Sequence, residues 1–343
     1  MVSMVKVKSV LSVALLGLLW GMPLNGFCED GSESSVGNSK RKTFSLGNVT
    51  VTVDIGKQKA IENPSGSAIY RLSRVGGTLS KLTATVSSIG GSPDLSRDGK
   101  AVAYDGWNAG QGCSDSHIFV YELATPLQVD DLGHGAMPSW SPDGKKLAFT
   151  QYSPGSGVGI MNADGTDRKI IDTAGWSAEW SPCEQKIAYT IRSHRGANIA
   201  VYDLKTEEKT LLFENSNLSF ISWGISWSPD GKRLCCYARD RDGTKKIVVV
   251  HVEGEEREHR VISNPLCNEL RASFGQPIAW GGDGDHVIFG AKGPGDKCRR
   301  LYRLHICGDS PPVEVGGVPE DMVCGDSYWH ADGTILFMNQ SEQ

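Results

Sequence analysis

The 343-residue sequence lacks the motifs that indicate several common kinds of chemistry. It has no Cys-x-x-Cys pair, which argues against a zinc finger or a thioredoxin-like redox site. It has no Gly-x-Ser-x-Gly elbow, where an α/β-hydrolase carries its nucleophile. Its histidines show neither His-x-His nor His-Glu-x-x-His spacing, so no metal is expected. We therefore predict no catalytic residue set, no metal and no cofactor, and the sequence favours a non-enzymatic protein.

The chain also lacks a basic stripe. It carries 40 acidic against 35 basic residues, a net charge of −5, which argues against nucleic acid as a partner. Its single long apolar run, Val10–Trp20, follows two lysines and is too short to span a bilayer comfortably. We predict that residues 1–28 are a signal peptide, with a lipid anchor at Cys28 as the alternative. The mature protein would be periplasmic or secreted and not membrane-spanning.

Six copies of one short phrase organise the rest of the chain. A typical copy reads Trp140-Ser-Pro-Asp-Gly-Lys, in which proline, aspartate and glycine favour a tight turn. The copies recur every 40–50 residues or so, a period typical of β-propeller blades. Each copy begins with an apolar residue that we expect to pack between blades: Leu95, Trp140, Trp180, Trp227, Trp280 and Trp329.

The ends of the repeat predict how the ring closes. The last copy stops after a second strand that ends near Met338, whereas residues 68–74 and 79–84 supply a third and a fourth strand before the first copy. The fold class is therefore all-β, a six-bladed β-propeller over residues 67–340 closed by N- and C-terminal half-blades. We expect residues 334–339 to pair antiparallel with residues 68–74. Residues 29–66 form a disordered or arm segment with a possible strand.

The phrase at Trp140, followed by Ile160-Met-Asn-Ala-Asp-Gly-Thr, resembles the repeat of TolB-type (WD40-like) propellers. The resemblance covers residues 67–340 and implies a six-bladed propeller that is usually extracytoplasmic. In TolB the propeller binds the peptidoglycan-associated lipoprotein of the Tol–Pal system. TolB also carries an α/β domain for which residues 29–66 leave no room, so we expect a propeller without it. The repeat also occurs in prolyl-oligopeptidase-type peptidases and some pectate-degrading lyases.

The irregular loops predict the binding face. The turns between first and second strands are short, whereas the second-to-third-strand loops and the blade-to-blade crossings are long and share the opposite face, called here the open face. Trp176 and Trp223 each stand four residues before a repeat tryptophan, which predicts equivalent places near the channel mouth; packing beneath the crossing loops is the alternative. The candidate binding residues are Trp107, His134, Trp176, Arg192, His194, Trp223, Arg239 and Arg271.

These residues predict a scaffold that binds an envelope or secreted protein, such as a lipoprotein or a cell-wall component. The alternative is a glycan-active enzyme or carbohydrate-binding module with its site at the channel mouth. Two triplets, Gly308-Asp-Ser and Gly325-Asp-Ser, resemble part of a hydrolase motif but are interpreted as turns in loops between blades. Finally, we predict at least one disulfide between two of Cys267, Cys298 and Cys324, which fall in or beside loops of the open face.

Overall fold

The computed structural model divides the chain into two units, residues 1–57 and 58–343. In the first unit it describes only short strands from residue 28 onward. In the second it describes β5 and residues 67–339, apart from 85–86, 88, 126–127, 184, 194–195, 214–217, 254–258, 263–270, 273–276 and 308–309. The predicted signal peptide lies outside the described residues except for Cys28. Among the described residues, none belongs to a helix with the length and apolar character needed to cross a membrane.

The first unit contains a small antiparallel sheet in which β3 is the shared partner. Strand β3 pairs with each of the other three strands of this sheet. The alternation of Val and Thr in β4 fits the period of two that a strand requires. The strands are β1 (Cys28–Glu29), β2 (Ser34–Ser35), β3 (Lys40–Leu46) and β4 (Val49–Ile55).

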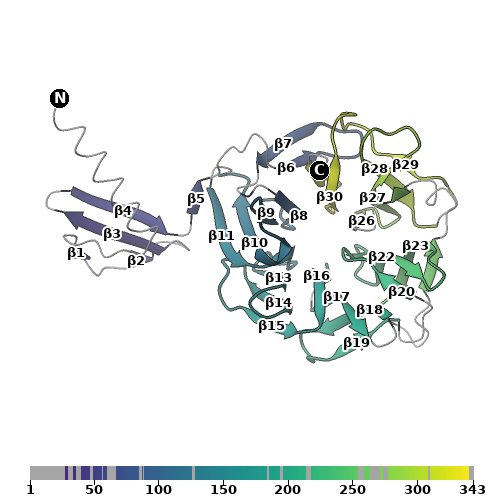
Figure 1. The fold of residues 1–343 in the computed structure, drawn as a ribbon, viewed down its shortest axis with the longest axis horizontal. Coiled ribbons are helices and arrows are strands. Elements are labelled where there is room, and N and C mark those ends of the chain that lie inside the picture. Colours follow the sequence, from purple (N-terminus) through teal and green to yellow (C-terminus); the bar gives the residue numbers. More distant parts are fainter. Residues whose placement is uncertain are drawn as a thin grey trace. The chain divides into compact units, whose positions relative to one another are not determined.

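The second unit is a ring of six antiparallel blades (Figure 1). Blade 1 comprises β8 (Ile89–Leu95), β9 (Ala101–Trp107), β10 (His117–Glu122) and β11 (Gln128–His134), with a 3-10 turn at Cys113–Asp115 and β5 (Lys57–Lys59) outermost. Blade 2 comprises β12 (Ala136–Trp140), β13 (Lys146–Gln151), β14 (Gly157–Asn162) and β15 (Lys169–Asp172). Blade 3 comprises β16 (Gly175–Trp180), β17 (Lys186–Ser193), β18 (Gly196–Asp203) and β19 (Lys209–Leu211).

In blades 4 and 5 the innermost strand is split in two. Blade 4 comprises β20 (Leu218–Ile221), β21 (Ser226–Trp227), β22 (Arg233–Asp240), β23 (Lys245–His251) and β24 (His259–Ile262). Blade 5 comprises β25 (Arg271–Ala272), β26 (Ile278–Trp280), β27 (His286–Lys292), β28 (Arg300–His305) and β29 (Val313–Glu314). Blade 6 comprises β30 (Cys324–Trp329), β31 (Ile335–Asn339), β6 (Ala68–Leu72) and β7 (Leu79–Ala84).

Blade 6 closes the ring as the half-blades predict. Strand β31 pairs antiparallel with β6, from Ile335 opposite Leu72 to Asn339 opposite Ala68. The two ends of the propeller thus share one sheet, and the exposed strand edge that an open ring would leave is removed. The prediction of six blades closed by N- and C-terminal half-blades is confirmed.

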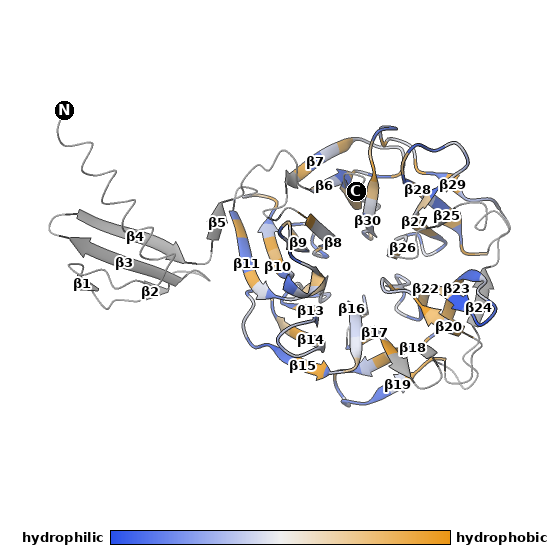
Figure 2. Cartoon of the chain, viewed as in Figure 1, coloured by the Kyte–Doolittle hydropathy of each residue, from blue (hydrophilic) through white to orange (hydrophobic). Residues whose placement is uncertain are grey.

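The hydrophobic core lies between neighbouring blades. One cluster joins Ile118 of blade 1 to Trp140 and Phe149 of blade 2, and five similar clusters occupy the other blade-to-blade interfaces. In Figure 2 apolar stretches (orange) appear within the strands that form these interfaces. The first residue of each repeat phrase is buried in such a cluster, except Trp180, which is half-buried against one. Sheet-to-sheet packing of alternate side chains therefore holds the ring together.

In blades 1 to 4 a kink in the innermost strand links the blade to the one before it. Ser92, Met137 and Ser177, with φ of 46°, 51° and 56°, and Gly224, with φ of 78°, occupy equivalent positions in blades 1 to 4. The kink turns the backbone N–H of the residue away from its own sheet, as in a β-bulge. Each N–H donates to a side chain of the preceding blade, at 2.7–2.9 Å: Asp326, Asp105, Thr150 and Ser177, in blade order.

Two glycines with positive φ allow the energetic cost of backbone strain to be measured apart from the cost of crowding. We expect Gly144→Ala, in an exposed turn with open space around it (φ 69°), to cost about 1 kcal/mol of unfolding free energy. Gly224→Ala adds a Cβ that overlaps Cα of Pro277, and should cost more, on the order of 3 kcal/mol. Urea unfolding of both variants measures the difference. Equal losses would show that the inner kink tolerates a side chain.

Candidate binding site

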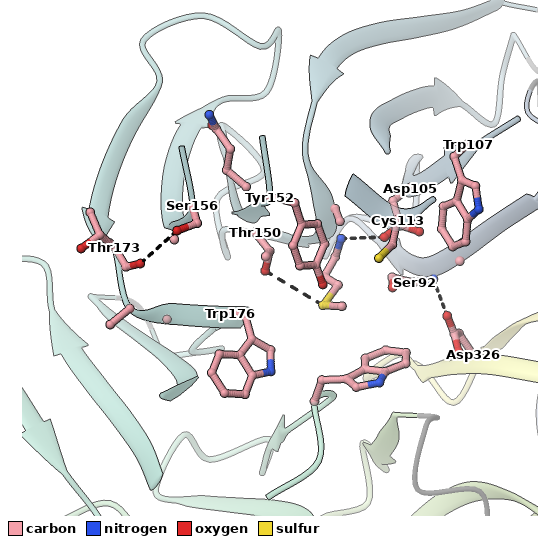
Figure 3. A pocket seen from close by; sticks show the side chains of 18 of the residues that line it. Ser92, Asp105, Trp107, Cys113, Thr150, Tyr152, Ser156, Thr173, Trp176 and Asp326 are labelled. Carbon is pink, nitrogen blue, oxygen red and sulfur yellow. Dashed lines mark hydrogen bonds between the residues drawn. The ribbon is translucent and has the colours of Figure 1, made fainter. Parts of the chain in front are cut away.

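A cavity of about 630 Å³ opens on the open face, between blades 1, 2 and 3 (Figure 3). Its wall is built from the open-face ends of the strands: β8, β12, β14 and β16 contribute their first residues, and β9 and β13 their last. The β9–β10 and β13–β14 loops, the crossing from blade 2 to blade 3, Trp223 of blade 4 and Asp326 of blade 6 complete the lining. The cavity therefore lies where the sequence places the irregular loops.

Three of the predicted binding residues line this cavity together. Trp107 ends β9, Trp176 lies near the start of β16, and Trp223 stands between β20 and β21. All three are half-buried, so each indole packs on one side and presents part of its surface to the cavity. Figure 3 shows Trp107 and Trp176 on opposite sides of the cavity with Tyr152 between them in that view. The structure thus groups these tryptophans, and their role in binding stays a prediction.

The other predicted residues are not brought to this cavity by the described structure. His134 ends β11, far out in blade 1, where its ring lies 4.5 Å from that of His117. Arg239 lies over the ring of Phe220, with 5.7 Å between the guanidinium carbon and the ring centroid. Neither His134 nor Arg239 lines the cavity. Arg192 and Arg271 lie in β17 and β25 with side chains outside the described residues, and His194 also lies outside them.

Two aspartates that sequence reasoning missed form the floor of the cavity. Asp105 and Asp326 are 3% and 5% exposed and come from β9 and β30. A Cβ added to Gly91 would lie 2.9 Å from Oδ1 of Asp105 and 2.9 Å from Oδ2 of Asp326, so the two carboxylates meet over this glycine. Asp326 belongs to the triplet Gly325-Asp-Ser, which was predicted as a loop turn; the triplet lies inside β30 instead.

The two carboxylates are only half satisfied by the protein. The N–H of Met137 donates to Oδ2 of Asp105 at 2.8 Å, and the N–H of Ser92 donates to Oδ2 of Asp326 at 2.9 Å. Oδ1 of each has no hydrogen-bond partner among the described residues. Burial raises the pKa of Asp105 to about 6, and burial, followed by the neighbouring Asp105, raises the pKa of Asp326 to about 7.

A second acidic pair lies deeper in the channel. Asp94 and Glu179 line the narrow space that continues from the cavity floor, and Asp326 borders both spaces. The N–H of Trp140 donates to Oδ2 of Asp94 at 2.7 Å, and the hydroxyl of Ser139 donates to Glu179 at 3.2 Å. Burial raises the pKa of Asp94 to about 7 and that of Glu179 well above its usual range. The channel axis is therefore lined by acids.

The cysteines do not form the predicted disulfide in this structure. Cys298 and Cys324 are both free and buried, and Cys267 lies outside the described residues. The thiol of Cys298 points at the carbonyl oxygens of Glu320 and Met322, each 3.2 Å away. Cys324 instead packs in the core between blades 5 and 6. Their side chains thus have separate partners.

Comparison with known proteins supports the fold. A structure assigned to TolB of Agrobacterium tumefaciens superposes with a TM-score of 0.63 at 16% identity, over 81% of this chain and 99% of that one. TolB of Acinetobacter baumannii gives a TM-score of 0.56 at 14% identity, over 91% of this chain and 78% of that one. The chain therefore has the TolB-like six-bladed propeller fold.

The sequence comparisons are less specific. The chain is 29% identical over 225 residues to "Uncharacterized peptidase YuxL" of Bacillus subtilis. That match covers 62% of this chain but only 31% of YuxL, so this chain spans about a third of that protein. No protein-family model matches the chain.

Proposed function

We propose that this protein is a non-enzymatic scaffold that works outside the cytoplasm and binds an envelope protein or peptide in the open-face cavity. The observation that carries the proposal is the grouping of Trp107, Trp176 and Trp223 in the wall of one cavity of about 630 Å³. Tryptophan is enriched among the residues that dominate protein binding, and a cavity of this size suits a few side chains of a partner.

Three further points support this assignment. A closed ring of six blades is a rigid support for loops, which is where binding residues concentrate. The TolB-like fold supports an extracytoplasmic place by analogy, with a lipoprotein or a cell-wall component as partner. YuxL is named a peptidase, which is consistent with a peptide rather than a glycan as the ligand of the shared region.

A glycan-active enzyme or carbohydrate-binding module is the second candidate, because Asp105 and Asp326 resemble a glycosidase pair of carboxyl groups. Each carboxylate, however, already accepts a backbone N–H that joins two blades. We therefore favour the binding scaffold. Release of sugar from cell-wall oligosaccharides by the purified protein, lost in Asp105→Asn, would support the enzyme instead.

Replacing two of the three cavity tryptophans tests the scaffold. We expect Trp176→Ala with Trp223→Ala to weaken binding of a partner captured from envelope extract by about 2 kcal/mol or more. The physical reason is the loss of the apolar surface that the two indoles present to the cavity. Calorimetric titration of the captured partner against the purified protein gives the change in affinity, and thermal unfolding gives the change in stability.

Trp180→Ala is the matched control. Trp180 lies four residues from Trp176 in the same strand but packs against the core between blades. We expect this variant to lose stability, up to about 3 kcal/mol, and to keep its affinity in the folded fraction. If the cavity variant instead loses stability and keeps its affinity, Trp176 and Trp223 are packing residues and the proposed function fails.

A further inference from the structure

The open-face cavity combines a negative floor with an aromatic wall. Asp105 and Asp326 are both more than nine-tenths buried, and Oδ1 of each has no hydrogen-bond partner among the described residues. The two carboxylates meet over Gly91 through Oδ1 of Asp105 and Oδ2 of Asp326, and the latter oxygen already accepts the N–H of Ser92. An unpaired buried acceptor is costly, since it has given up water without gaining a protein partner. A donor supplied by a ligand would remove that cost at two places at once.

The described part of the chain places no basic side chain in the cavity to neutralise this floor. Among the described residues that line it, none is lysine, arginine or histidine. Arg299, which lowers the pKa of Asp326, donates to the carbonyl oxygen of Cys324 at 3.4 Å and does not line the cavity. The electrostatic field inside the cavity therefore favours a positively charged guest.

The wall determines which kind of cation fits. Trp107, Trp176, Trp223 and Tyr152 present aromatic surface to the cavity, and indole faces attract organic cations. A calcium ion would need six to eight oxygen ligands. Among the described residues, no group of three or more histidine, cysteine or acidic side chains could hold a metal ion. An aromatic wall over a pair of carboxylates suits a guanidinium or ammonium group better than a bare metal.

We infer that the cavity receives a basic side chain of the partner, arginine or lysine, whose charged head donates to Asp105 and Asp326 while its stem packs against the tryptophans. This inference rests on the proposed function and specifies the ligand chemistry of the same site. Arginine suits it best, because a planar guanidinium offers several donors in one plane and also stacks on indole.

The affinity of the cavity for a cation should change with pH. The titratable and charged groups around each aspartate are the other aspartate, the hydroxyl of Tyr152, Cys113 and, from outside the cavity, Arg299. Asp94 and Glu179 line the deeper space that Asp326 also borders. Burial raises the pKa of Tyr152 to about 12, so between pH 5 and 8 it stays neutral. With pKa values of about 6 and 7, the two aspartates are mostly neutral at pH 5 and mostly charged at pH 8. Cation binding should therefore strengthen as pH rises over this range.

The experiment uses two small probes on the whole purified protein, followed by tryptophan fluorescence and calorimetry. Nα-acetyl-arginine methylamide is the cation, and Nα-acetyl-citrulline methylamide is its neutral isostere. At pH 8 we expect the arginine probe to bind at least tenfold more tightly than the citrulline probe. We expect its affinity to fall about tenfold or more at pH 5.

Isosteric variants test whether the two aspartates on the cavity floor bind the arginine probe. Asp105→Asn and Asp326→Asn keep an oxygen for the N–H groups of Met137 and Ser92, and each should lower the affinity for the arginine probe at least tenfold. Asp98→Asn, in an exposed first-to-second-strand turn on the opposite face, is the control and should leave the affinity unchanged. Thermal unfolding checks that each variant is folded.

The outcomes separate this inference from the proposed function. Equal binding of the two probes, or no binding of either, overturns the cationic ligand; the scaffold stands if the tryptophan variants still lose their partner. Binding of the arginine probe alone, with partner capture unaffected by the tryptophan variants, supports the inference for the cavity and overturns the scaffold. Calcium chloride that binds wild type, but not Asp105→Asn, and displaces the arginine probe would overturn the organic cation in favour of a metal.

Discussion

Deletion of residues 326–343 is expected to abolish the soluble monomer. The deletion removes β31 and most of β30, so β6 loses the partner strand that closes the ring. It also removes buried side chains from the clusters on both sides of blade 6, including Trp329, Leu336 and Phe337. The truncated chain would expose an unpaired strand edge and two apolar surfaces, which together favour aggregation. Size-exclusion chromatography with light scattering measures the result.

A point variant tests the same closure more gently. Phe337 is fully buried and stacks on Tyr70 of β6, with 5.9 Å between the ring centroids. We expect Phe337→Ala to lower the free energy of unfolding by about 3–5 kcal/mol, because it leaves a cavity where β31 packs beside β6. Phe337→Leu, which keeps most of the volume, should cost less. Removal of residues 340–343 alone is the control for the truncation and should leave a monomer.

The closure would be refuted by a truncated protein that remains monomeric and unfolds in one cooperative transition like the full chain. That result would mean that five blades and a half-blade hold together without the last strands. The truncation could instead lose the monomer while Phe337→Ala has little effect. That result would show that the backbone hydrogen bonds between β31 and β6, rather than side-chain packing, hold the ring closed.

The blades could be predicted from the sequence because their signals are local. The turn in Ser-Pro-Asp-Gly needs only neighbouring residues: the hydroxyl of Ser141 and the N–H of Lys145 both donate to Asp143, and Gly144 takes the positive φ. A turn of this kind repeated at a fixed period leaves few alternatives to a propeller. The half-blades at the two ends then followed from counting strands.

The floor of the cavity could not be predicted in the same way. Asp105 stands at the end of a regular strand, where a polar residue before a loop is ordinary, and Asp326 stood in a triplet that is typical of a turn. What brings them together is the ring itself, which places strand ends more than two hundred residues apart beside one another. The sequence signal that could have identified these aspartates is an acidic residue in the innermost or second strand of a blade, at a position that faces the channel. Trp176 and Trp223 were found because the repeat aligns them.

The second large expected effect is a loss of stability as pH rises, caused by the acidic pair Asp94 and Glu179 deeper in the channel. Asp94 is 7% exposed and faces Glu179 of β16 and Tyr328 of β30, all three with pKa values raised first by burial. The pKa of Asp94 is about 7 in the folded protein against 3.8 in the unfolded chain. Between these values the folded state keeps a proton that the unfolded chain releases. The free energy of unfolding should therefore fall as pH rises from about 4 to about 8.

Asp94→Asn isolates this contribution. For Asp94 alone the fall amounts to about 4 kcal/mol, taking about 1.4 kcal/mol for each unit by which its pKa is raised. The asparagine keeps an acceptor for the N–H of Trp140 but has no proton to lose. We expect the variant to match wild type near pH 4.5 and to be more stable than wild type at pH 8. Urea unfolding at pH 4.5, 6 and 8, followed by tryptophan fluorescence, measures both slopes.

Asp143→Asn is the matched control, because it makes the same chemical change where the shift has the opposite sign. The backbone N–H of Lys145, followed by the hydroxyl of Ser141, lowers the pKa of the exposed Asp143. Its carboxylate therefore stabilises the fold above the unfolded-state pKa and stops doing so in acid. The control should not gain stability at pH 8. If Asp94→Asn keeps the wild-type slope, or is less stable than wild type at pH 8, the buried carboxylate is stabilised as an anion and the acidic channel is held charged by contacts beyond those described.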